Sequence, residues 1–299
     1  MPTVLSPREE KPLKILYLGH TGAGKTGSLC SLAAAGYNVR VLDLDNGWEI
    51  FTDFLTNKEK SPYCRPKDGL WTQDLANSVA ERLSWVTITE RYNIVGTKAV
   101  PRAEAWSRLN QQLNNWTDEG KSFGNISKWT SQDVLVIDGL SRLCEAAMNF
   151  QLSLNGRLDK GPRVGTSGDN DYTQAYSLIT NFLDLLKSDD IKCQIIMICH
   201  IQFMVEMQQN PTASEALKDL KGFPQTVGKL ISPRIGQYFN HSLRAKTIGT
   251  GPGTRRVIVT NNDENIELKN TAPLRVRAEY PLEFGLAEYF KTIRGPKAS

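Results

Sequence analysis

Residues 14–26 read KILYLGHTGAGKT, and this stretch decides the fold. The apolar run at 14–18 predicts a buried strand, and the small residues from about Thr26 to Ala35 predict a helix that ends at Gly36. Between them lies a complete GxxxxGK[ST] pattern. In this pattern the glycines let backbone N–H groups curl around a phosphate at the start of a helix. The stretch therefore predicts a phosphate-binding loop between a strand and a helix.

The same pattern indicates which ligands the loop binds. Lys25 is expected to reach the β- and γ-phosphates of a nucleotide, and the Thr26 hydroxyl is expected to bind Mg²⁺. Such a site needs a second carboxylate at the end of a neighbouring buried strand, and Asp138 follows the apolar run 134–137. We therefore predict that ATP and Mg²⁺ bind to Asp138 and to the loop residues, named the P-loop from here on: Gly19, His20, Thr21, Gly22, Ala23, Gly24, Lys25 and Thr26.

Apolar runs and helical spacings alternate along the chain. Strands are expected at 39–45, 86–89, 134–137 and 194–199, and helices at 102–116 and 172–187. Uninterrupted apolar strands between helices favour a mostly parallel, doubly wound sheet in an α/β fold. Segments 242–248 and 255–260 flank a glycine-rich turn and predict a C-terminal antiparallel β-hairpin. We expect an N-terminal extension at 1–13 and a single domain at 14–299.

Composition indicates a soluble globular protein. The chain has 299 residues, of which 40% are hydrophobic and 23% charged, with a net charge of +4. The positive charge is concentrated after residue 210, where 14 Lys and Arg face 8 Asp and Glu, which is compatible with a polyanionic partner. No apolar run approaches the roughly 20 residues of a membrane span. The five cysteines include no CxxC pair, so we expect reduced thiols and a cytoplasmic location.

With the P-loop and Asp138 placed, residues 14–280 resemble the RecA-like recombinase ATPases. The resemblance is closest to the short, core-only Sak-type recombinases of phages, the phage nucleotide-binding AAA family. The segment VLDLDNG at 41–47 is similar to the family's strand end whose Glu orients the attacking water. The resemblance implies this catalytic role, beside that of Lys25, for Asp45, with Glu49 as the alternative.

Three further segments carry the resemblance. The run IIMICH ends at His200, where the family has a polar γ-phosphate sensor. LKNTAP resembles the family's K-N-K segment, whose cations reach the nucleotide of the adjacent subunit. Lys269 matches the first cation, whereas Thr271 replaces the second, for which Arg275 or Arg277 could substitute.

Two long polar segments, 154–171 and 203–226, stand where the family has its DNA-binding loops. Cations there would bind phosphates, and Phe203 or Phe223 could stack on a base. The resemblance implies that nucleic acid is contacted by Arg157, Lys160, Arg163, Lys218, Lys221 and Phe223.

The expected function is that of an ATP-dependent recombinase that binds single-stranded DNA. The resemblance implies annealing or strand exchange by a homo-oligomeric ring or filament that hydrolyses ATP with Mg²⁺ at subunit interfaces. It also implies a phage protein in the host cytoplasm, with a single-strand-binding protein as a candidate partner. One alternative is a hexameric helicase or packaging motor. Others are a nucleotide kinase with Arg157, Lys160 and Arg163 as its lid, and a non-hydrolysing nucleotide switch, which the shorter carboxylate of Asp45 leaves open.

Overall fold

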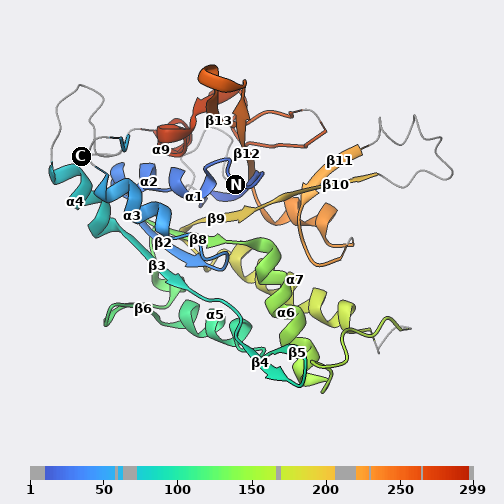
Figure 1. Cartoon of the computed structure of the whole chain (residues 1–299). Coiled ribbons are helices and arrows are strands. Elements are labelled where there is room, and N and C mark those ends of the chain that lie inside the picture. Colours follow the sequence, from blue (N-terminus) through green and yellow to red (C-terminus); the bar gives the residue numbers. More distant parts are fainter. Residues whose placement is uncertain are drawn as a thin grey trace, which may run out of the picture.

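An eight-stranded sheet runs through the centre of the computed structural model, with helices on both of its faces (Figure 1). The structure describes residues 11–57, 60–62, 73–165, 170–205, 220–228, 230–263 and 265–295. The strand order is β14-β13-β12-β1-β9-β8-β2-β3. Neighbouring strands from β12 to β3 are parallel, and β13 and β14 are antiparallel to their neighbours. The predicted fold class, a mostly parallel α/β sheet with a C-terminal antiparallel hairpin, is confirmed.

The central strands are buried along their whole length, and their parallel register brings their carboxyl ends together. Asp43 of β2 pairs with Asp138 of β8, and Leu18 of β1 pairs with Cys199 of β9. The P-loop follows β1 at this same end of the sheet. The strands are β1 (Lys14–Gly19), β2 (Asn38–Asp43), β3 (Leu83–Thr87), β8 (Asp133–Asp138), β9 (Gln194–Cys199), β12 (His241–Ile248), β13 (Arg255–Val259) and β14 (Glu279–Pro281).

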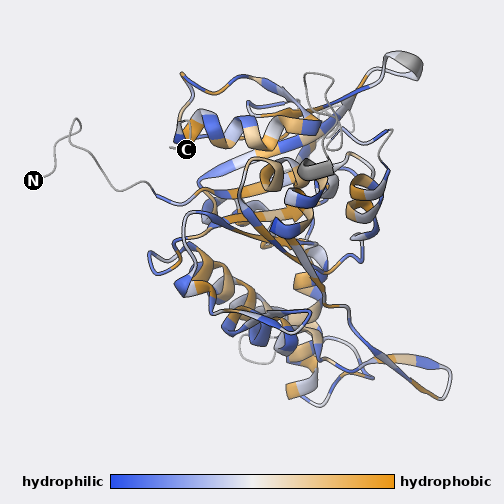
Figure 2. Cartoon of the chain, turned by 90° about the vertical axis from the view of Figure 1, so that its left-hand side faces the viewer, coloured by the Kyte–Doolittle hydropathy of each residue, from blue (hydrophilic) through white to orange (hydrophobic). Residues whose placement is uncertain are grey.

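Two hydrophobic clusters cover the two faces of the sheet. Ile15 and Tyr17 of β1 belong to one cluster, and Leu16 and Leu18 belong to the other, as the two-residue period of a strand requires. Apolar residues gather along the sheet and on the sides of the helices that meet it (Figure 2). Helices α1 (Lys25–Ser28), α2 (Cys30–Ala34), α3 (Glu49–Thr56), α4 (Gln73–Arg82) and α9 (Leu282–Arg294) lie on one face, and α5 (Ala105–Asn114), α6 (Leu140–Leu154) and α7 (Asp171–Lys187) on the other.

Several elements differ from the sequence expectations. The helix expected at about 26–35 is divided into α1 and α2 at Leu29, whose own backbone is helical, and Gly36 follows with a φ of 87°. The segment 203–226 was expected to be a loop, but β10 (Ile201–Val205) and β11 (Leu220–Pro224) pair as antiparallel strands. They are far apart in sequence, so no short turn signal marks the pairing.

Smaller elements complete the described structure. Two more antiparallel hairpins occur in segments for which no strand was predicted, and three 3-10 helices occur in connections. These are β4 (Tyr92–Val95) with β5 (Lys98–Pro101), β6 (Trp116–Asp118) with β7 (Lys121–Gly124), and the 3-10 helices η1 (Ile126–Lys128), η2 (Ser232–Tyr238) and η3 (Gly251–Gly253). Among the described residues, no helix combines the length and the apolar character needed to cross a membrane.

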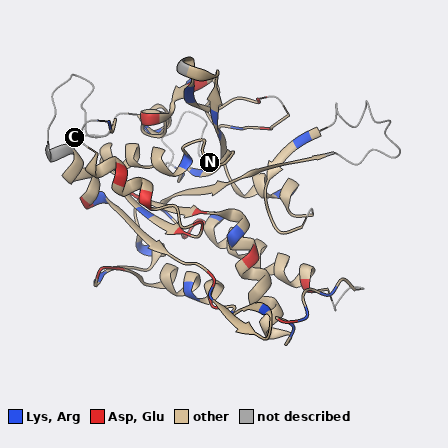
Figure 3. Cartoon of the chain, in the orientation of Figure 1, with Lys and Arg blue, Asp and Glu red and all other residues tan. Residues whose placement is uncertain are grey.

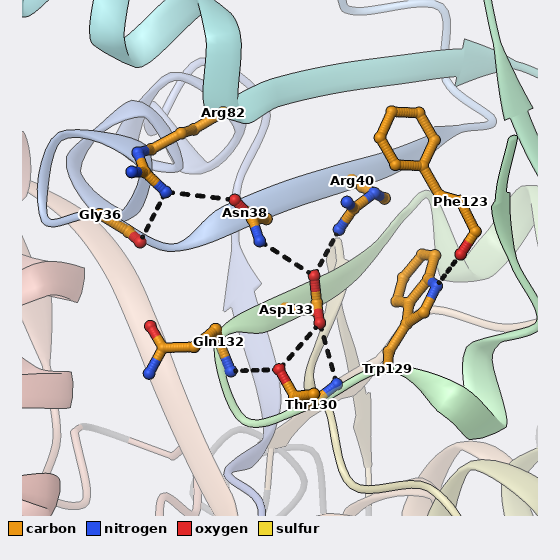
Figure 4. Close-up of polar contacts among 9 residues, drawn as sticks. All are labelled: Gly36, Asn38, Arg40, Arg82, Phe123, Trp129, Thr130, Gln132 and Asp133. Carbon is orange, nitrogen blue, oxygen red and sulfur yellow. Dashed lines mark hydrogen bonds and ion pairs between the residues drawn. The ribbon is translucent and has the colours of Figure 1, made fainter. Parts of the chain in front are cut away.

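A charged cluster joins the β6–β7 hairpin to the amino end of β8 (Figure 4). Arg40 Nη1 donates to Asp133 Oδ1 at 2.7 Å, and its guanidinium lies 4.4 Å from the ring centre of Phe123 and 4.7 Å from that of Trp129. The other Asp133 oxygen accepts the backbone N–H of Thr130 at 2.9 Å. Since both charges are hydrogen-bonded and the Arg40 guanidinium also stacks on two rings, the charges at this end of β8 are balanced.

Candidate functional site

The P-loop leaves the carboxyl end of β1 and leads into α1. Gly22 and Gly24 have φ values of 77° and 87°, a region that side chains other than glycine rarely adopt. A Cβ on Gly24 would lie 2.4 Å from Leu282 Cδ2 at the start of α9. Both the backbone conformation and the close contact with α9 therefore require glycine at this position.

Lys25 lies inside the curl of the P-loop, with only 7% of its surface exposed. Its ammonium group donates to the carbonyl oxygens of Gly19 and His20, each at 2.9 Å. Burial lowers the pKa of Lys25, while the nearby carboxyl groups of Asp138 and Asp45 oppose this shift. The structure thus holds a buried cation at the centre of the loop.

Thr26 and Asp138, the two predicted magnesium ligands, are in direct contact. The Thr26 hydroxyl donates to Asp138 Oδ2 at 2.6 Å. Asp138 is 3% exposed, and burial raises its pKa to about 6, with further upward contributions from the charges of Asp45 and Asp43. A hydroxyl and a carboxylate oxygen are ligands of the kind that Mg²⁺ prefers, so the residues present fit this ion.

Asp45 lies beside Asp138, between two basic side chains. Its Oδ2 is 3.6 Å from His200 Nε2, and its Oδ1 is 3.7 Å from Arg142 Nε. Gly139, which follows Asp138, has a φ of 117°, and a Cβ there would lie 3.0 Å from the Asp45 carboxyl. Glycine thus leaves room for this carboxylate. The structure therefore brings together Asp45, His200 and Asp138, which the sequence placed in one site.

Asp43 and Arg142 belong to this site but were not predicted. Asp43 accepts the backbone N–H groups of Gly47 and Trp48 at 3.1 and 3.3 Å, and so shapes the turn that carries Asp45. Burial raises the pKa of Asp43. The sequence contains a signal for this turn, because two aspartates stand at the strand end and Asn-Gly follows the second of them. Arg142, in the first turn of α6, stands four residues after the strand-end Asp138.

Glu49, the alternative to Asp45, is exposed at the first position of α3. The carboxylate that His200 and Arg142 approach is that of Asp45. The geometry therefore favours Asp45 over Glu49 as the candidate for orienting water.

The hairpin β10–β11 begins directly after His200 and contacts the P-loop. The rings of His20 and Phe203 stack with centroids 6.1 Å apart and an angle of 25° between their planes. On the returning side, the backbone N–H of Gln225 donates to the His200 carbonyl at 2.8 Å. Phe203 is 40% exposed, whereas Phe223 is partly buried on β11. Phe203 is thus the better placed of the two rings to meet a ligand.

The remaining predicted nucleic-acid residues fall into two regions. Lys221 on β11 lies 3.8 Å from Glu267, and Lys218 lies outside the described residues. Beyond α6, Lys160 and Arg163 are exposed beside a cavity of about 420 Å³.

Arg157 has a structural contact instead of a free guanidinium. Its Nε lies 3.3 Å from Oδ2 of the buried Asp171, and its Nη2 donates to the Gly161 carbonyl at 3.2 Å. These contacts tie the segment after α6 to the start of α7. Arg157 therefore orders this segment, and Lys160 and Arg163 are the exposed cations beside the cavity.

Lys269 lies away from the P-loop of its own chain. Its backbone bridges Ser242 near the amino end of β12, and its ammonium donates to the Gly236 carbonyl at 2.8 Å. Burial lowers the pKa of Lys269. Thr271, in the place of the second cation, lies 3.2 Å from Nε2 of the buried His241. The structure thus leaves Lys269 without a contact to its own P-loop among the described residues.

Comparisons with known proteins give similarity at the level of solved structures. No protein-family model matches the chain, and no curated protein matches it. The flagellar accessory protein FlaH from Methanocaldococcus jannaschii is 13% identical, with 92% of this chain and 89% of that chain covered and a TM-score of 0.35. A KaiC-like protein from Pyrococcus horikoshii is 9% identical, with coverage of 90% and 84% and a TM-score of 0.39. An ATPase from the type III secretion system of pathogenic bacteria is 14% identical, with coverage of 79% and 52% and a TM-score of 0.36.

Proposed function

We propose that this chain hydrolyses ATP with Mg²⁺ and that hydrolysis is coupled to single-stranded DNA bound by a homo-oligomer during annealing or strand exchange. The observation that carries the ATPase part is the 2.6 Å contact between Thr26 and Asp138, beside the buried ammonium of Lys25. Two hard oxygen ligands next to a buried cation suit a magnesium-bound polyphosphate. The recombinase part follows from the sequence resemblance and from the contact between the P-loop and β10–β11.

The residues of the site divide the chemical work. Lys25, now hydrogen-bonded to two carbonyls of its own loop, would turn its ammonium to the β- and γ-phosphates. Thr26 and Asp138 would hold Mg²⁺, which neutralises charge on the phosphates when bound. Asp45 would orient water and accept its proton, while His200 and Arg142 fix the direction of the Asp45 carboxylate.

The β10–β11 hairpin is the proposed link between nucleotide and DNA. The hairpin starts directly after His200, and its Phe203 stacks on His20 of the P-loop. A movement of His200 or of the P-loop on nucleotide binding would therefore move the hairpin. Lys221 lies on β11, and further basic residues lie on the segment after α6, both toward the right of the view in Figure 3. Single-stranded DNA would contact these cations through phosphates and Phe203 through a base. Lys269 would act on the nucleotide of an adjacent subunit.

The structure gives a reason to prefer hydrolysis to transfer of phosphate between nucleotides. The cations that a kinase would use as a lid lie beyond the far end of α6. The 15 residues of this helix span about 22 Å from the Asp138 end. Lys160 and Arg163 are therefore too distant to close over the P-loop in this arrangement.

The test is ATP hydrolysis with and without single-stranded DNA for the wild type, Lys25→Ala and the control Lys291→Ala. Lys291 is exposed in the last turn of α9. We expect Lys25→Ala to lower hydrolysis by about 100-fold or more, because it removes the cation at the phosphates, and Lys291→Ala to have no effect. Hydrolysis that survives Lys25→Ala would refute the ATPase proposal. Hydrolysis that DNA does not stimulate, without ATP-dependent DNA affinity, would refute the recombinase proposal alone.

A further inference from the structure

Leu274 is the most exposed large hydrophobic side chain in the described part of the chain, with 99% of its surface open to solvent. It stands at the apex of a tight turn. The backbone N–H groups of Arg275 and Val276 both donate to the Ala272 carbonyl, at 3.0 and 3.1 Å. Since these bonds order the backbone in advance, contact of Leu274 with another molecule would cost little conformational entropy.

Hydrogen bonds also fix both ends of this turn, residues 271–277. At its start, the Thr271 hydroxyl lies 3.2 Å from Nε2 of His241, the first residue of β12. At its end, the Arg277 carbonyl accepts the hydroxyl of Thr260, which follows β13, at 2.6 Å. Because β13 is antiparallel to β12, both contacts lie at the end of these strands opposite the P-loop. The 271–277 turn therefore projects from the β13–β14 edge of the sheet at the end away from the P-loop.

A cavity of about 320 Å³ lies beside Asp45, beyond the carboxyl ends of β2 and β3 and against α5 and α6. It is far larger than the volume of one water molecule, about 30 Å³, so a side chain from outside can enter it. Next to the cavity, the β4–β5 hairpin exposes Ile94 to 83%. The apolar side chains of its walls are Leu44, Ile88, Tyr92, Ala105 and Ala146.

The charges of the cavity and of the turn are complementary. The cavity walls contain Asp45, Glu90 and Glu145 against Arg142 alone, a formal charge of −2. Glu90 accepts two backbone N–H groups at 3.2 Å, but no cationic side chain among the described residues lies within ion-pair distance of it. The turn contains arginines and no acidic residue. Of these, Arg275 is exposed and has no carboxylate within ion-pair distance in the part of the chain that the structure describes.

We propose that the 271–277 turn of one copy of this chain docks in the cavity beside Asp45 of the next copy. Leu274 enters between the apolar walls, and Arg275 pairs with Glu90. The inference rests on the proposed homo-oligomer and names the contact that forms it. Burial of an apolar side chain among apolar walls supplies affinity, and the opposite charges at the rim set the orientation of the two copies.

The two surfaces belong to opposite parts of the sheet. The turn projects from the β13–β14 edge, and the cavity lies at the β2–β3 edge, beyond the other ends of the strands. They therefore cannot meet within one chain. A contact between two unlike surfaces repeats head to tail, which gives a ring or a filament. In this arrangement Arg275 brings a positive charge close to Asp45 of the next copy, and Lys269, two residues before the turn, is carried toward the same site.

Sedimentation velocity of the full chain, with and without Mg²⁺–ATP, tests this contact with two complementary variants. Leu274→Asp removes the docking side chain and keeps the cavity, whereas Thr89→Trp fills the cavity from its exposed wall and keeps the turn. Each variant alone should weaken self-association by at least about 30-fold, as loss of an interface hot spot does. Their equimolar mixture should form dimers and nothing larger, because each mixed pair has one intact turn and one intact cavity. The control Lys291→Ala should associate as the wild type does.

A charge exchange tests the ion pair of the contact. Arg275→Glu and Glu90→Arg should each weaken self-association by about tenfold, because like charges then face each other. The double variant should recover most of the wild-type affinity, since the two charges are opposite again. Thermal unfolding of every variant shows whether it is folded.

Three results would overturn the contact: wild-type association in both Leu274→Asp and Thr89→Trp, a mixture of the two folded variants that stays monomeric, or a wild type that is monomeric under both conditions. Failure of the proposed function looks different. A wild type that assembles through this contact but does not hydrolyse ATP would refute the ATPase and leave the contact standing. DNA-stimulated hydrolysis by oligomers that neither variant weakens would refute the contact alone.

Discussion

Replacement of Asp138 by Asn is expected to stabilise the nucleotide-free protein near neutral pH while it abolishes Mg²⁺-dependent hydrolysis. Burial, with the charges of Asp45 and Asp43, raises the pKa of Asp138 from 3.8 to about 6. Between these two values the folded state binds more protons at this carboxyl than the unfolded state does. The free energy of unfolding therefore falls as pH rises from about 4 to 6, and the full cost of the buried charge is present above pH 6.

The size of the effect follows from the shift in pKa. A rise from 3.8 to about 6 corresponds to about 3 kcal/mol at 1.36 kcal/mol per unit. Asn keeps an oxygen that can accept the Thr26 hydroxyl, but its N–H₂ group would cost about 1 kcal/mol if it finds no acceptor. We therefore expect Asp138→Asn to raise the free energy of unfolding by about 2 kcal/mol near pH 7.5, and to give no increase near pH 4, where the folded carboxyl is protonated.

Urea unfolding of the nucleotide-free protein at both pH values measures this difference. Asp133→Asn is a matched control, because Asp133 begins the strand that Asp138 ends. Burial alone would raise the pKa of Asp133, but hydrogen bonds from Thr130, Arg40 and Asn38 hold it below its usual range. Asp133→Asn should thus destabilise the protein near neutral pH and lose this effect in acid. A destabilising effect of Asp138→Asn that does not depend on pH would refute the reasoning.

Three further substitutions test other parts of the structure. Phe203→Ala should weaken ATP-dependent binding of single-stranded DNA by about 1–3 kcal/mol, measured by fluorescence anisotropy, and leave ATP affinity unchanged. An equal loss of DNA affinity in Phe223→Ala would contradict the choice of Phe203 as the ring that contacts DNA. Arg40→Ala should lower the free energy of unfolding by about 3 kcal/mol in urea because it leaves Asp133 unpaired, and an unchanged urea midpoint would count against that pairing. Arg157→Ala should lower the melting temperature, whereas Lys160→Ala should leave it unchanged. A larger decrease for Lys160→Ala than for Arg157→Ala would contradict the structural role of Arg157.

The elements that the sequence predicted well are those whose burial is visible in a short stretch. β9 spans Gln194–Cys199 as predicted, because an apolar run buried on both faces needs no knowledge of its neighbours. The hairpin β10–β11 was missed because its strands pair across a long separation in sequence. Helix α9 was not predicted, although Leu282, Leu286 and Tyr289 are apolar residues at helical spacing.

The candidate site shows the same division between local and distant signals. Lys25 and Thr26 are given by a contiguous motif, and Asp138 by an apolar strand that ends in a carboxylate. Arg142 approaches Asp45 only because β8, which precedes α6, pairs with β2. No local pattern in the sequence contains that pairing, so Arg142 could not be predicted from it.

The two ends of β8 give a second argument for a ligand, which starts from buried charge and not from the sequence motif. Asp133 and Asp138 belong to one strand and are both almost buried. At the amino end, Asp133 has a guanidinium at 2.7 Å and its pKa is lowered. At the carboxyl end, Asp138 has one hydroxyl donor and faces two more carboxyl groups, and its pKa is raised to about 6 although the Lys25 charge opposes the shift. A buried carboxylate left this short of positive charge costs stability, and the binding of a cation would relieve that cost.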